Sequence, residues 1–182
     1  AQIAIKEKVD AIIVYDGISR KGLKYIKTQA PQITTIMDVS ISMRPFMKAN
    51  FEKDMKNYHH NGFYKEEAYL WNIKYEKVIR EELKYVDYFF SPSNIVTKSL
   101  EFCGIDRKKI KIVPYGVNIN KFQFTKKKNT NNEALKLIYV GQISYRKGLH
   151  HLLKIIKEYS PNKIKINLAG SFNENNEIIK QY

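Results

Sequence analysis

Short apolar runs and longer segments with helical spacing alternate along this chain. The short runs are rich in Ile, Val, Leu and aromatic residues, and each ends near a polar residue, glycine or proline, which is typical of buried strands. They occupy residues 10–15, 33–37, 87–90, 110–113, 137–140 and 163–168. Strands that alternate with helices pack into parallel sheets, so this pattern predicts an α/β fold.

Helices are predicted between several of these runs. A serine stands at the N-cap position of the helices predicted over residues 19–28 and 93–103. A longer helix is predicted over residues 62–85, and its apolar spacing leads us to expect a buried Trp71. The charged run Arg80-Glu81-Glu82 on that helix is interpreted as a solvated face.

The stretch from Asn118 to Asn132 has the composition of a linker, because it is rich in Lys and Asn and poor in apolar residues. The strand-helix rhythm restarts at Leu135. We therefore predict a first α/β domain over residues 1–117, a linker over residues 118–134 and a second α/β domain over residues 135–182. The chain begins without Met and ends within an apparent helix, so we expect a fragment in which both domains are incomplete.

Charge and cysteine content narrow the class of protein. The chain has 32 Lys and Arg against 18 Asp and Glu, a formal net charge of +14, which favours anionic partners. The run Lys126-Lys127-Lys128 lies in the linker and indicates a solvated tether. The single Cys103 excludes an intramolecular disulfide framework and is interpreted as a buried, inert thiol. No apolar run approaches the roughly 20 residues that span a bilayer, so we expect a soluble, cytoplasmic protein.

The segment from Lys136 to His150 contains the clearest candidate for a binding site. An apolar strand stops at Gly141, adjacent cations follow at Arg146 and Lys147, and Gly148 opens an amphipathic helix. This order places backbone N–H groups and two positive side chains around one point, as α/β folds do when they hold a phosphate. The glycine spacing is that of neither a P-loop nor a G-x-G-x-x-G motif. The alternative is an ordinary turn with a solvated Arg-Lys pair.

Other candidate groups point to structure rather than to chemistry. The pairs His59-His60 and His150-His151 are sequence neighbours, so we expect their side chains to diverge and no metal site to form. Ser93 lacks the G-x-S-x-G context of a nucleophile, which favours its role as a helix cap. A basic nucleic-acid-binding module is an alternative for the whole chain, but the aromatic residues fall within apolar strands and helix faces, where core packing explains them.

Three motifs resemble those of one enzyme family, in the family's order. They are Val86-Asp-Tyr-Phe-Phe-Ser-Pro-Ser93, Lys109-Ile-Lys-Ile-Val-Pro-Tyr-Gly-Val-Asn118 and Leu137-Ile-Tyr-Val-Gly-Gln-Ile-Ser-Tyr-Arg-Lys-Gly148. They are similar to the GT-B glycosyltransferases of family 4, also called glycosyltransferase group 1. The resemblance runs from about Asp10 to Gly170. It implies two Rossmann-like domains with parallel sheets, an acceptor domain followed by a nucleotide-sugar-binding domain.

The resemblance also implies roles for individual residues. Arg146 and Lys147 match the family's cations on the donor diphosphate, Gly141 lets the loop approach it, and Gly170 matches a position near the nucleotide. Taken alone, Gly170 indicates only a strand-ending turn. Asp38 stands where many members have His on the acceptor side, and it either orients an acceptor hydroxyl or caps its loop.

The family's catalytic glutamate pair, spaced by seven intervening residues, would lie beyond Tyr182. Glu174 and Glu177 are too early and too closely spaced to replace it. We therefore expect the fragment to be inactive alone, and the catalytic residues stay unassigned.

The implied activity is hexosyl transfer with retention, from a nucleoside-diphosphate sugar to a carbohydrate or lipid-linked acceptor. The family's usual setting implies bacterial polysaccharide biosynthesis at the cell envelope, with the inner face of an anionic membrane as one location. No metal or other cofactor and no nucleic acid is expected. A noncatalytic relative that keeps the fold is the remaining alternative.

Overall fold

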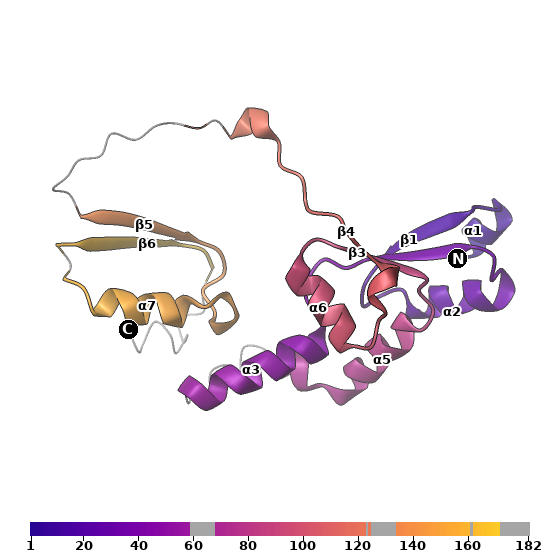
Figure 1. Cartoon of the computed structure of the whole chain (residues 1–182), viewed down its shortest axis with the longest axis horizontal. Helices are drawn as coiled ribbons and strands as arrows, with labels where there is room; N and C mark the ends of the chain where they lie inside the picture. The colour runs from indigo at the N-terminus through magenta and orange to yellow at the C-terminus, as the bar shows by residue number, and fades with distance from the viewer. Residues whose placement is uncertain (59–67, 123, 125–133, 161, 172–182) are drawn as a thin grey trace. The chain divides into compact units, whose positions relative to one another are not determined.

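The computed structural model describes residues 1–58, 68–122, 124, 134–160 and 162–171. The chain divides into two compact units (Figure 1). Ala1–Asn57 and Tyr69–Val117 belong to the first unit, and the described residues from Asn118 onward belong to the second.

The first unit is built on a four-stranded parallel sheet in the order β1-β2-β3-β4. Its strands are β1 (Ala11–Tyr15), β2 (Thr34–Asp38), β3 (Tyr88–Ser91) and β4 (Ile110–Ile112). Its helices are α1 (Gln2–Lys6), α2 (Arg20–Gln29), α3 (Arg44–Tyr58), α5 (Ile73–Leu83) and α6 (Asn94–Phe102), with 3-10 turns η1 (Ala68–Trp71) and η2 (Arg107–Lys109).

The core of the first unit lies on one face of this sheet. Met37 and Phe89 are fully buried there, and they pack with residues of the helices such as Leu23, Ile79 and Leu100. Side chains alternate between the two faces of a strand. Ile13 and Tyr15 of β1 and Tyr88 of β3 therefore point to the other face, where they are 63%, 64% and 50% exposed. Within the described residues, helices cover one face of the sheet.

Both helices that were predicted to begin after a serine do so, but only one of the two serines caps its helix. The Ser93 hydroxyl accepts the N–H of Val96 at 3.4 Å and caps α6, as predicted. Ser19 precedes α2 at the predicted position, but its hydroxyl donates to the Tyr15 carbonyl at 3.0 Å and does not cap the helix. Cys103 ends α6 partly buried, and burial raises the pKa of its thiol. The expectation of an unreactive thiol agrees with that direction.

The long helix predicted over residues 62–85 is wrong in its extent. Residues 62–67 lie outside the described residues, η1 follows, and α5 begins only at Ile73. The cause is Asn72, whose side-chain oxygen accepts the N–H groups of Lys74 and Tyr75 at 3.1 and 3.4 Å and so starts a new helix. Trp71 lies before this cap and is only half-buried, which contradicts the expected burial.

The second unit pairs β5 (Leu135–Val140) with β6 (Ile164–Ala169) in parallel over six residues. The 3-10 turn η4 (Tyr145–Lys147) and the helix α7 (Leu149–Lys157) join the two strands, and η3 (Ile119–Lys121) also lies in this part of the chain. In Figure 1, α7 runs beside the two-stranded sheet. The division of the six strands into two parallel sheets agrees with the sequence prediction. None of the described helices has the length and apolar content needed to cross a membrane.

Candidate functional site: the loop between β5 and α7

The loop from Gly141 to Gly148 leaves the carboxyl end of β5 and enters α7. Gly141 has φ +147° and Gly148 has φ +72°, backbone conformations that glycine adopts readily and other residues rarely do. Gly148 is the residue that precedes α7, so the helix starts where the sequence predicts. The two glycines therefore define the bends at both ends of the loop.

The two predicted cations lie in the short turn η4 inside this loop. Arg146 is partly buried and Lys147 is exposed. Between them and β5, Tyr145 is 2% exposed and anchors the turn, and its ring centroid lies 5.1 Å from that of His150. A buried aromatic anchor thus lies in the same turn as one partly buried and one exposed cation.

Tyr139 connects the strand to the loop. Its hydroxyl donates a hydrogen bond of 2.8 Å to the Gln142 carbonyl. Burial raises the pKa of this hydroxyl, and the positive charge of Arg146 acts in the opposite direction. The hydroxyl and Arg146 are therefore electrostatically coupled. No motif singled out Tyr139, because in the sequence it is one more apolar residue of a strand.

Ser144 adds a buried polar atom to the loop. The residue is 3% exposed, and its hydroxyl oxygen has no hydrogen-bond partner within the part of the chain that the structure describes. A buried hydroxyl without a partner destabilises a fold, so such groups are uncommon.

Gly170 lies beside Gly141 at the carboxyl ends of β5 and β6. Gly141 N–H donates to the Ala169 carbonyl at 2.9 Å, and Ile143 N–H donates to the Ser171 carbonyl at 3.1 Å. A side-chain carbon on Gly170 would stand 1.8 Å from the Gly141 carbonyl oxygen. Close backbone approach thus explains this glycine without a ligand, and its place near a nucleotide stays a prediction.

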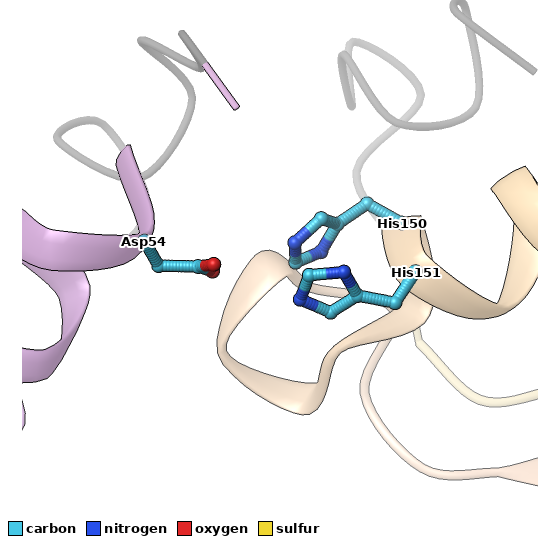
Figure 2. Close-up of side chains that lie close together, drawn as sticks. All are labelled: Asp54, His150 and His151. Atoms are coloured by element: carbon cyan, nitrogen blue, oxygen red, sulfur yellow. The ribbon is translucent and has the colours of Figure 1, made fainter. Parts of the chain in front are cut away.

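The expected divergence of His150 and His151 is wrong. Their ring centroids lie 3.9 Å apart, and Figure 2 shows the two imidazoles side by side at the start of α7. Residues adjacent in a helix point about 100° apart at the backbone, but the side-chain torsions of these two bring the rings together. His150 is 2% exposed. Asp54, also drawn in Figure 2, belongs to α3 of the first unit.

In the first unit, the turn between β1 and α2 holds an internal anion. Glu82 of α5 is 1% exposed, and its carboxylate accepts the N–H groups of Gly17 and Ser19 at 2.8 and 2.5 Å. A solvated Glu82 was predicted, so this is a correction. The signal was present: Glu82 shares the inward stripe of its helix with Ile79, three residues before it.

Asp38 is the last residue of β2 and pairs with Tyr15 of β1 and Phe90 of β3. The loop predicted to begin at Asp38 therefore begins one residue later. Nearby, the Ser40 carbonyl accepts the Tyr115 hydroxyl at 3.2 Å, which joins the loops after β2 and β4. The structure places Asp38 at the carboxyl edge of the sheet, the edge where ligands of open α/β sheets bind. Its acceptor-side role stays a prediction.

Several predictions lie outside the described residues. They are the interpretation of His59-His60, the tether at Lys126-Lys127-Lys128, most of the linker over residues 118–134, and the interpretations of Glu174 and Glu177.

Comparison with known proteins bears on the fold. The sequence matches no family model, and no curated protein matches it. The structure, however, is similar to an apo form of the lipopolysaccharide outer core galactosyltransferase WaaB, with a TM-score of 0.61 and 16% sequence identity. That likeness covers 98% of this chain and 42% of the galactosyltransferase.

The chain has a GT-B-type fold. The predicted α/β class with Rossmann-like units and parallel sheets is thereby confirmed. A UDP-GlcNAc 2-epimerase from Methanocaldococcus jannaschii is a weaker structural match, with a TM-score of 0.43 and 15% identity over 99% of this chain and 48% of the epimerase. The chain spans less than half the length of either protein.

Proposed function

We propose that this protein is a retaining glycosyltransferase of family 4 that transfers a hexosyl group from a nucleoside-diphosphate sugar to a carbohydrate or lipid-linked acceptor. The observation that carries the proposal is the loop between β5 and α7, which joins two glycine bends, Arg146 and Lys147 at the carboxyl end of a parallel strand. Ligands of open α/β sheets bind at this edge.

The loop can stabilise a leaving diphosphate. As the bond between the sugar and the diphosphate breaks, the electron pair stays with the diphosphate, whose negative charge grows. A cation fixed nearby then stabilises the transition state more than the ground state, which raises the rate. Two fixed cations also supply the charge that a divalent metal would otherwise provide, so we propose that no metal is essential.

The first unit supports the same assignment by contrast. Its β1–α2 turn, a second place where a Rossmann-like unit can bind phosphate, already has the carboxylate of Glu82 on the N–H groups of Gly17 and Ser19. A phosphate there would have to displace a buried anion. We therefore assign the diphosphate to the second unit and the acceptor to the first, where Asp38 is the candidate contact. A role in bacterial cell-envelope polysaccharide synthesis, at the inner face of the membrane, is part of the proposal.

Binding of a diphosphate tests the assignment directly. Calorimetric titration of residues 1–182 with inorganic pyrophosphate, and with UDP, GDP and ADP, is repeated for Arg146→Ala and Lys147→Ala. Each loses a charged contact, so we expect the Kd to rise about tenfold or more. Lys163→Ala is the matched control, because Lys163 is an exposed lysine of the same unit at the amino end of β6. If Arg146→Ala and Lys147→Ala bind these ligands as tightly as the parent, the loop is not the diphosphate site.

Turnover tests the chemical step. In the whole protein, loss of either cation should lower the rate of sugar transfer on the order of 10²–10³-fold, as loss of an oxyanion-hole donor does. Lys147→Arg should recover only part of it, because a planar guanidinium does not replace a compact ammonium. EDTA should leave the rate largely unchanged. Strict dependence on a divalent ion would overturn the metal-free mechanism, and a folded protein that binds nucleotide sugar without transfer would favour a noncatalytic relative.

A further inference from the structure

We propose that Tyr139 is a positioning residue for the diphosphate loop, which it holds in the shape that presents Arg146. This inference rests on the proposed function, because it concerns the same loop. Tyr139 touches neither the diphosphate nor the sugar in this account. It acts through the backbone of Gln142 and the charge of Arg146.

The backbone of Tyr139 is rigid and its hydroxyl reaches out of the strand. β5 pairs with β6 through the whole of its length, and Tyr139 pairs with Leu168. From this fixed base the hydroxyl donates to the Gln142 carbonyl at 2.8 Å, which spans the bend at Gly141. The strand therefore controls the first turn of the loop through one side-chain contact.

The Tyr139 side chain also lies close to Gly141. A side-chain carbon placed on Gly141 would lie 3.9 Å from the Tyr139 hydroxyl and 4.0 Å from the ring carbon Cε1. The side chain thus lies on the side of Gly141 where a larger residue would project. Gly141 has φ +147°, and as a glycine it has many alternative backbone conformations, so a bulky ring on this side limits which of them the loop adopts.

The same hydroxyl is coupled to the cation. Burial raises the pKa of the Tyr139 hydroxyl, and the positive charge of Arg146 acts in the opposite direction, so the two side chains are electrostatically coupled. The phenol donates its single proton to Gln142, so its lone pairs remain on the oxygen and attract a positive group. One hydroxyl is therefore hydrogen-bonded to the start of the loop and electrostatically coupled to the cation near its end.

The test removes the hydroxyl and keeps the ring. Tyr139→Phe and the control Tyr159→Phe, which changes an exposed tyrosine of the same unit, are titrated with inorganic pyrophosphate and with UDP. We expect Tyr139→Phe to raise the Kd of both probes by roughly three- to tenfold, the effect of one hydrogen bond, and Tyr159→Phe to leave them unchanged. Circular dichroism and thermal melting verify that both variants are folded.

A double-mutant cycle distinguishes positioning from a general loss of stability. If Tyr139 acts by presenting Arg146, its substitution should have little further effect in Arg146→Ala, so the two changes should be strongly non-additive. Fully additive effects on the Kd, or parent affinity in Tyr139→Phe, would overturn the inference. These outcomes differ from failure of the proposed function, in which Arg146→Ala and Lys147→Ala themselves bind pyrophosphate like the parent.

The whole protein gives a second measurement. Misplaced loop geometry should lower kcat for sugar transfer in Tyr139→Phe by a similar factor while the KM for the acceptor stays unchanged, because the acceptor is assigned to the other unit. A change confined to the acceptor KM would contradict a role in the diphosphate loop.

Discussion

Gly170 stands so close to Gly141 that a side-chain carbon on Gly170 would lie 1.8 Å from the Gly141 carbonyl oxygen and 2.7 Å from its carbonyl carbon. Both atoms belong to backbone that hydrogen bonds hold in place, since Gly141 N–H donates to Ala169 and Ile143 N–H donates to Ser171. The contact cannot be relieved by rotation of a side chain. The ends of β5 and β6 therefore require glycine at position 170 for reasons of packing alone.

Gly170→Ala should accordingly destabilise the second unit. Overpacking of this kind costs about 1–3 kcal/mol and occasionally more. Gly116→Ala is the matched control, because a side-chain carbon there meets nothing within 4 Å. Urea unfolding followed by circular dichroism measures both. Equal stability of the two variants would contradict the close approach, and loss of nucleotide binding in a fully stable Gly170→Ala would instead favour a direct role near the nucleotide.

Glu82→Ala should be destabilising, because it leaves the partly buried N–H groups of Gly17 and Ser19 without their acceptor. Each unsatisfied buried group costs about 1–3 kcal/mol. Glu82→Gln keeps an acceptor oxygen and should lose less. Glu76→Gln, which breaks only the i,i+4 pair with Arg80, should change the free energy of unfolding by about 0.3–0.5 kcal/mol. Chemical denaturation should show that the loss in the free energy of unfolding decreases in the order Glu82→Ala, Glu82→Gln, Glu76→Gln.

Asp87 makes the stability of the first unit depend on pH. Burial by itself would raise the pKa of its carboxyl, but hydrogen bonds from Lys27 and from the backbone and hydroxyl of Thr35 outweigh burial and lower the pKa. A carboxyl whose pKa is lower in the folded protein stabilises the fold above its unfolded pKa of about 3.9. That contribution is lost as the pH falls from there through the lower folded pKa.

Asp87→Asn should therefore cost about 1 kcal/mol at pH 7, a figure that allows for the partial exposure of the carboxyl. The difference from the parent should shrink as the pH falls below about 4, where the parent carboxyl takes up its proton. Urea denaturation at pH 7, 5 and 3 measures this. A difference that stays constant across these values would show that the charge of Asp87 is not what matters.

Ser144 and Ser99 should respond in opposite ways to the same substitution. The buried Ser99 hydroxyl donates to the Val96 carbonyl at 2.6 Å and accepts the Met43 N–H at 2.9 Å, so Ser99→Ala should cost about 1–3 kcal/mol. The Ser144 hydroxyl has no partner within the described residues, so Ser144→Ala should leave stability unchanged or raise it by about 1 kcal/mol. Thermal unfolding of the two variants measures the difference. Equal losses of stability would mean that the Ser144 hydroxyl has a hydrogen-bond partner.

Sequence patterns alone were sufficient to predict the strands, the start of α6 at Ser93 and the glycines and cations of the β5–α7 loop. These depend on local rules: an apolar run of strand length, a hydroxyl at a helix start, a glycine where the chain must bend. Residues a few positions apart settle them. The loop could therefore be located before any contact between distant segments was known, and the α/β class followed from the alternation of the elements.

Which polar residues are buried, and which groups they bind, depends on tertiary packing. Glu82 has its partners at Gly17 and Ser19, more than sixty residues earlier in the chain. Gly170 is constrained by Gly141, which follows the neighbouring strand β5, and the parallel register brings the two glycines together. Periodicity assigns a residue to a face of its own helix or strand, but the distance and identity of the group opposite depend on how separate elements pack. For that reason the sequence did not reveal that Glu82 accepts hydrogen bonds from the turn before α2, or that Tyr139 donates one to the loop after β5.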